Sequence, residues 1–180
     1  MHWRKIFLIV FLLGTSVCPP LFAAPPSRVR SLTGVDAVQV AVEDLNHTTR
    51  QTGLRKEQIQ DFAEQYLLKQ GMKVMRGIKG RPIVYVRLSS VIGGMGAHAP
   101  VSFYLTVQVK QLSRLVHGRE ETSSELTPLE SPLLVTTWED GTMVMLDRKE
   151  LSFYVQQVLS NLLGALVQDY QEANGKEGDS

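Results

Sequence analysis

The chain has 180 residues, with 19 basic and 18 acidic side chains, a formal net charge of +1 and a single cysteine. This near balance gives no basic field of the kind that binds nucleic acid, so we expect no nucleic-acid partner. A lone cysteine excludes a disulfide within the chain, and the length suits one domain that depends on its hydrophobic core.

The N-terminus has the order of a secretory signal. Arg4 and Lys5 precede the apolar run 6–13, and a stretch of small residues with two prolines follows. A cationic end, a short apolar helix and small residues are what export and cleavage require. Because the prolines interrupt the uncharged stretch and no stop-transfer charges follow, cleavage is favoured over an uncleaved anchor. We predict that residues 1–23 are a signal peptide and that the protein is periplasmic or secreted.

Two processing sites compete. Cleavage after Ala23 places Ala23 and Leu21 at the two positions where signal peptidase needs small residues. Lipidation of Cys18 would need a small residue before it, and Val17 stands there. We favour cleavage after Ala23, which discards Cys18 and leaves 17 basic against 18 acidic residues. The alternative is a lipoprotein held peripherally on a membrane.

The first half of the exported chain predicts a linker, a strand and a helix. Residues 24–36 contain prolines and no periodicity, which indicates a linker. Residues 37–45 follow as an alternating strand with valines on one face. Residues 54–70 have apolar side chains three and four positions apart, typical of an amphipathic helix, and Gly71 ends it. Residues 72–75 are a short strand candidate.

Two longer strands and a hairpin are predicted next. Residues 82–90 and 101–110 alternate cleanly, which indicates an antiparallel pair with one covered and one solvent-facing side. The polar segment 116–132 predicts a mobile loop. Residues 133–146 contain Asp140-Gly141, a pair favoured in type I′ turns, and so predict two short strands around a turn.

The chain closes with a second amphipathic helix. Asp147 and Glu150 form a capping-box-like start, and the pattern ends near Asn174. Its apolar stripe is Leu151, Val155, Val158, Leu159, Leu162, Leu166 and Tyr170. We predict an α+β fold: a two-layer sandwich in which two amphipathic helices pack on one face of a mixed β-sheet. Residues 37–173 form the single domain, and residues 174–180 are a disordered tail.

The sequence contains one spacing typical of a cofactor-binding motif, but the elements predicted around it do not fit that motif. Gly94, Gly96 and Ala99 match a dinucleotide-binding spacing, but Pro100 and an alternating strand follow where that motif requires a helix. We interpret the segment as a loop between strands. No metalloprotease motif occurs, and without a nucleophile elbow a serine hydrolase lacks its usual exposed turn, so we assign no catalytic residue and no cofactor.

A metal site is a minor alternative. His98 and His117 could join Glu120 or Glu121 in a cluster of loop residues. Zinc sites normally show tighter ligand spacing, so we predict none.

The best binding candidates lie on the solvent-facing side of the sheet. They are Tyr85, Arg87, Tyr104 and Lys110. Tyrosines beside cations suit a protein or glycan partner, whereas cross-strand packing is the plainer explanation. Trp138 is a further candidate for partner binding, with a core position as its alternative.

The order of strands and helices resembles a group of small bacterial periplasmic domains of the anticodon-binding-like type. That group includes the N-terminal domain of TolB, PelC, and curli-secretion and synthase-activator lipoproteins. The resemblance rests on the first strand at residues 38–45, Gly71 after the first helix and the long final helix. It implies a non-enzymatic accessory or adaptor protein of the cell envelope that binds an envelope protein or glycan. A small exported enzyme and a glycan-binding module are the alternatives.

Overall fold

The computed structural model describes residues 27–95, 99–113 and 132–175. The predicted signal peptide with Cys18 and Ala23, and residues 116–131 of the predicted loop, lie outside these residues. The elements are, in chain order, α1 (Ser27–Arg30), β1 (Gln39–Val42), α2 (His47–Arg50), α3 (Lys56–Lys69), β2 (Ile83–Ile92), β3 (Pro100–Ser113), β4 (Leu133–Asp147), a 3-10 turn η1 (Arg148–Glu150) and α4 (Leu151–Asn174).

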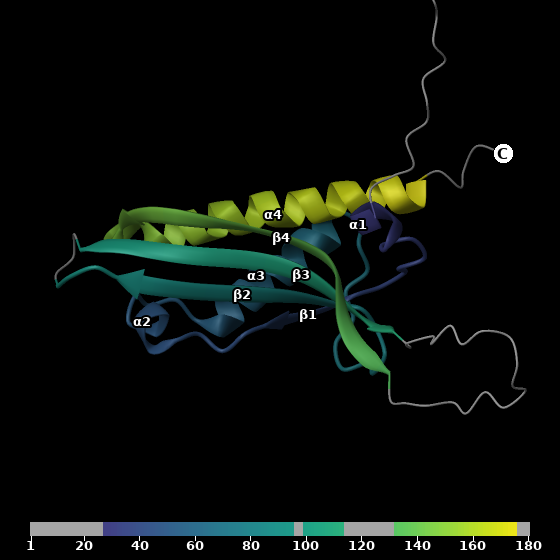
Figure 1. Cartoon of the computed structure of the whole chain (residues 1–180), viewed down its shortest axis with the longest axis horizontal. Helices are drawn as coiled ribbons and strands as arrows, with labels where there is room; N and C mark the ends of the chain where they lie inside the picture. Colours follow the sequence, from purple (N-terminus) through teal and green to yellow (C-terminus); the bar gives the residue numbers. More distant parts are fainter. Residues whose placement is uncertain (1–26, 96–98, 114–131, 176–180) are drawn as a thin grey trace, which may run out of the picture.

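The four strands form one mixed sheet in the order β1-β2-β3-β4 (Figure 1). β1 and β2 are parallel neighbours joined through α3, and the pairs β2–β3 and β3–β4 are antiparallel. A parallel pair needs a long crossover connection, which α3 supplies. The predicted α+β class with a mixed sheet is confirmed.

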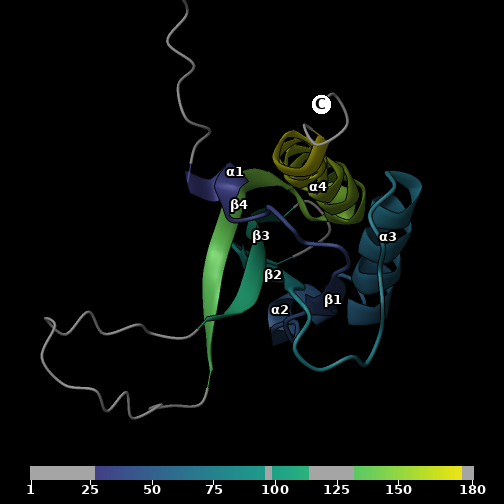
Figure 2. The ribbon, with the colours of Figure 1, turned by 90° about the vertical axis from the view of Figure 1, so that its right-hand side faces the viewer.

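α3 and α4 cover one face of this sheet, and among the described residues no helix of comparable length lies on its other face (Figure 2). The alternation in β2 and β3 selects the covered face, because every second side chain points toward the helices. Val84, Val86 and Leu88 of β2 are buried there. The β3 residues buried beside them are Val101, Phe103, Leu105, Val107 and Val109.

The predicted hairpin at Asp140-Gly141 is wrong. Both residues lie inside β4, which runs for 15 residues without a turn. Asp140 pairs with Val107 and Gly141 with Thr106 of β3. The Asp-Gly pair favours a turn only where the chain can reverse, and here β3 offers a continuous partner along the whole segment. Because Gly141 has no side chain, β4 can pair closely with β3 at this position.

The prediction that residues 24–36 form a linker is also wrong for the part that begins at Ser27. Val29, Leu32 and Val35 are buried, so this segment belongs to the core. At the other end Asn174, predicted in the tail, is the last residue of α4. Its side chain accepts a hydrogen bond of 2.9 Å from the backbone N–H of Gly34. The packed unit therefore extends from Ser27 to Asn174.

Helix α3 ends as predicted, with Gly71 just beyond it in a left-handed conformation at a φ of 86°. The strand predicted at 72–75 is reduced to one bridge between Val38 and Val74. Along the described ranges, no helix has both the length and the apolar character needed to cross a bilayer.

Candidate functional site

The open face is the side of the sheet that faces away from α3 and α4. Tyr85 and Arg87 of β2 lie on it, as do Tyr104 and Lys110 of β3, because these residues alternate with the buried valines and leucines. The register places Tyr85 opposite Gln108 and Arg87 opposite Thr106. The structure thus brings the four predicted residues onto one surface.

The middle of the open face, around Tyr85, is polar and internally paired. The Lys110 ammonium lies 3.7 Å from the centre of the Tyr85 ring, a cation–π contact. Arg87 forms an ion pair of 2.9 Å with Glu43, which follows β1. One face of the Tyr85 ring is thus covered by Lys110, and the guanidinium of Arg87 is paired with Glu43. Cross-strand packing therefore accounts for Tyr85, Arg87 and Lys110.

The end of the open face around Val91 is apolar, and a second exposed apolar pair, Leu112 and Leu134, lies beyond Lys110. The exposed fractions are 68% for Val91, 44% for Tyr104, 70% for Met143 and 74% for Met145. Tyr104 lies directly opposite Met143, and Ser102 stands between Val91 and Met145 in the register. Side chains opposite one another on adjacent strands lie about 5 Å apart at Cβ, so these four residues form one patch. We call it the methionine patch.

Met143 and Met145 were not among the binding residues predicted from the sequence. The predicted turn at Asp140-Gly141 divided β4 and left the face of residues 142–146 undefined. The signal was present, since Met143 and Met145 alternate with Val144 and Leu146, which pack against the core. Only the pairing of Met143 with Tyr104 shows that the methionines share a face with the predicted tyrosine.

Gly141 lets β3 and β4 approach closely beside the methionine patch. A Cβ on Gly141 would lie 2.5 Å from Cγ2 of Thr106 and 3.3 Å from the hydroxyl oxygen of Tyr104. Thr106 is itself buried, and its hydroxyl has no hydrogen-bond partner among the described residues. Thr106 and Tyr104 can therefore occupy these positions only because residue 141 has no side chain.

Trp138 does not belong to the open face. It points to the helix side, where only 1% of its surface is exposed. The indole N–H donates a hydrogen bond of 2.7 Å to Asp169 of α4. A residue buried in this way cannot contact a partner, so the prediction of partner binding by Trp138 is corrected in favour of its core alternative.

Two shallow hollows open at the end of the sheet where α2 lies. One, of about 360 Å³, has Arg148 as its only titratable lining residue among those described. The other, of about 620 Å³, is lined by Asp44 and Lys56 among others. Lys56 donates a hydrogen bond of 2.7 Å to Asp44, which lowers the pKa of that carboxyl. A carboxyl held as the carboxylate in this way is a poor general acid at neutral pH.

The histidine alternative falls outside the structural description. His98, His117, Glu120 and Glu121 are not among the described residues, and neither is Gly96 of the glycine-rich segment. Within residues 27–95, 99–113 and 132–175, no group of three or more metal-ligating side chains is close enough to hold an ion.

No protein-family model matches the chain, and no curated protein matches it. Solved structures do match. A minor lipoprotein from Acinetobacter baumannii is 9% identical, over 78% of this chain and 93% of that one, with a TM-score of 0.39. A PelC dodecamer from Paraburkholderia phytofirmans is 13% identical, over 73% and 86% of the two chains, with a TM-score of 0.40.

Rare lipoprotein B from Shewanella oneidensis is 9% identical, over 74% of this chain and 94% of that one, with a TM-score of 0.32. Two of these three structural neighbours are lipoproteins by name. Scores at this level carry no information about a partner or an activity.

Proposed function

We propose that the protein is an exported, non-enzymatic accessory protein of the bacterial cell envelope that binds another envelope protein through the methionine patch. The signal-like N-terminus supports export into the envelope. The methionine patch is the observation that carries the binding role. Open faces of antiparallel sheets are normally polar, and exposed apolar patches on soluble proteins commonly mark interaction sites.

The chemistry of the patch suits a protein partner. Methionine side chains are unbranched and polarisable, so Met143 and Met145 can adapt to an irregular apolar surface. Tyr104 adds a rigid ring with a polar end, a combination enriched at interfaces. A glycan stacks on exposed aromatic rings, and the patch offers a single such ring, Tyr104, among three aliphatic side chains. We therefore favour a protein over a glycan.

The proposal is tested by crosslinking in cells. A photoreactive amino acid at position 143 should crosslink to one envelope protein, and the same group at Phe153 on α4 should not. Phe153 is a matched control because it is also exposed and apolar but lies on a helix on the other side of the molecule. The double variant Met143→Glu/Met145→Glu should abolish recovery of the partner, and Phe153→Glu should leave it unchanged.

Both variants should keep the stability of the parent within about half a kcal/mol, because exposed substitutions usually do. The proposal fails if position 143 gives no crosslink, or if the methionine variant recovers the partner as well as the parent does. Crosslinking of position 143 only to a second copy would make the patch a self-association surface instead.

A further inference from the structure

The charges are unevenly distributed although they nearly cancel. From Gln65 to Arg119 the chain contains no aspartate or glutamate. The first part of this segment is the connection from α3 to β2, which carries Lys73, Arg76 and Lys79. It runs across the end of the molecule that faces the viewer in Figure 2. α1 lies at the same end of the molecule, with α4 between it and α3 (Figure 2).

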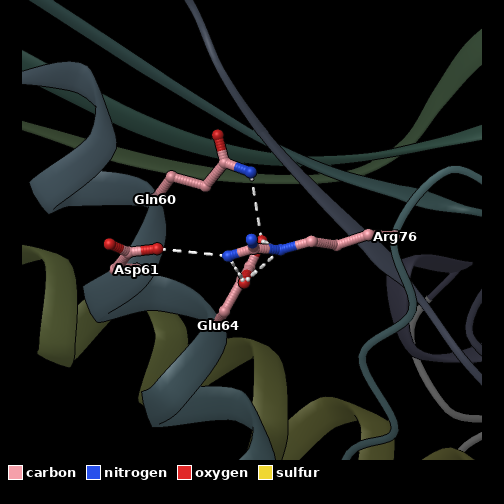
Figure 3. A network of polar contacts seen from close by, with 4 residues as sticks. All are labelled: Gln60, Asp61, Glu64 and Arg76. Carbon is pink, nitrogen blue, oxygen red and sulfur yellow. Dashed lines mark hydrogen bonds and ion pairs between the residues drawn. The ribbon is translucent and has the colours of Figure 1, made fainter.

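Two arginines fasten the connection to the body of the protein. Arg76 reaches back to α3, where its Nε lies 2.9 Å from Oε2 of Glu64 and its guanidinium also pairs with Asp61 (Figure 3). Arg81 pairs with Asp36, just before β1. The acidic partners in these pairs are Asp36, Asp61 and Glu64. The remaining cations are therefore not neutralised by them.

Three lysines remain available at this end. Lys69, Lys73 and Lys79 are exposed, and no carboxylate of the described residues lies within ion-pair distance of them. Exposed apolar side chains stand among them, namely Leu68, Met75 and Ile78. Lysines interleaved with exposed apolar side chains fit a surface that is negatively charged outside and apolar beneath, as an anionic bilayer is.

We propose that this end of the molecule, the lysine end formed by Lys69, Lys73, Met75, Ile78 and Lys79, binds the surface of an anionic phospholipid membrane. The point where the leader joins the protein gives independent support. The residues before Ser27 enter the described chain at α1, which lies at this end of the molecule (Figure 2).

The support holds for either processing site. If Cys18 were lipidated, only eight residues would separate it from Ser27, a span of about 30 Å at most. If the chain is cut after Ala23, the lysines alone would hold it. In both cases the lysine end faces the lipid, and the methionine patch on the open face remains free for a protein.

Binding to vesicles tests the proposal with the exported, processed protein. The protein should cosediment with vesicles of phosphatidylcholine and phosphatidylglycerol, more weakly at high salt. Lys69→Gln/Lys73→Gln/Lys79→Gln should lower this partitioning about a hundredfold, because each lysine contributes roughly fivefold near an anionic surface. The matched control is Arg50→Gln/Arg55→Gln/Lys149→Gln, which removes three exposed cations from the opposite end and should change partitioning less than about threefold.

A second readout reports contact at this end even if an acyl chain tethers the protein. Ile78→Trp places a fluorophore in the connection, and Met95→Trp places one at the far end of the sheet. Brominated lipids in anionic vesicles should quench the tryptophan at position 78 and leave that at 95 unaffected. Trp138 contributes a constant background because it is buried.

Several outcomes would overturn the proposal. The first is equal quenching of the tryptophans at positions 78 and 95. The second is an equal loss of vesicle partitioning in the two triple variants. The third is that brominated vesicles with phosphatidylglycerol quench position 78 no more than brominated vesicles of phosphatidylcholine alone. Retention by soluble polyphosphate without binding to vesicles would assign the lysines to a polyanion and would equally refute a membrane role.

Discussion

The indole Nε1 of Trp138 donates a hydrogen bond of 2.7 Å to the buried carboxylate of Asp169. Nε of Arg28 lies 2.9 Å from the same oxygen, and its guanidinium is 5.9 Å from the centre of the Trp138 ring. The three residues come from β4, α4 and α1. One carboxylate therefore joins the edge strand, the long helix and the first described helix of the chain.

Asp169→Ala should lower the free energy of unfolding by about 2–3 kcal/mol, because the buried indole N–H would lose its acceptor. The measurement is urea unfolding followed by circular dichroism. Glu172→Ala, an exposed acidic position in the same helix, should stay within about half a kcal/mol of the parent. Equal stability of the two variants would mean that Asp169 does not hold Trp138 in place.

Gly141→Ala should destabilise the protein by about 1–3 kcal/mol, because the added methyl overlaps Cγ2 of Thr106. Thr106→Ser removes that methyl, so the double variant Gly141→Ala/Thr106→Ser should recover part of the loss. Thermal unfolding of the two single variants and the double variant measures this coupling. Simple additivity would show that the close approach of β3 and β4 is not the cause.

Glu64 should make stability depend on pH in acid. Burial would raise the pKa of Glu64, but hydrogen bonds from Arg76 and Gln60 lower it by more, so it lies below the ordinary value of 4.5. A carboxyl with a lower pKa in the folded state stabilises the protein above its unfolded pKa, and this contribution is lost as the pH falls through the folded pKa.

Glu64→Gln should therefore cost about 1 kcal/mol at neutral pH, a modest value because Arg76 is largely exposed. The difference from the parent should shrink as the pH falls below 4.5, the ordinary pKa of the group. Urea unfolding across this range measures it. A difference that is constant with pH would point to packing instead of charge.

Leu162→Ala should destabilise the protein by about 3 kcal/mol, as expected for a buried leucine. Phe62→Ala should cost less, because Phe62 is only half-buried and packs at the margin of the core beside Tyr66, with 6.4 Å between ring centres. Paired denaturant curves rank the two. The opposite order would show that α3 packs more deeply than the structure places it.

Intact-mass analysis of the exported protein distinguishes the two processing sites. Cleavage after Ala23 gives a chain that begins at Ala24 and carries no lipid, and Cys18→Ser should leave its processing unchanged. A diacylated N-terminal Cys18 would contradict this and would place the protein on a membrane from the start.

The sequence by itself determined the main parts of the fold. Alternation fixed which side chains of β2 and β3 are buried, because a strand has only two faces and burial of apolar surface chooses between them. The period of α3 and the glycine after it fixed that helix for the same reason. These are local patterns that a packed core does not override. They also placed Tyr85, Arg87, Tyr104 and Lys110 on one open face.

Tertiary structure decided what depends on distant partners. β4 is continuous through Asp140-Gly141 because β3 pairs with it along its length, and this pairing outweighs the preference of the dipeptide for a turn. The methionine patch exists for the same reason, since Met143 meets Tyr104 only in that register. Trp138 became a core residue because Asp169, 31 positions later, accepts its hydrogen bond. Contacts between residues so far apart are set by how the elements pack, which no local pattern records.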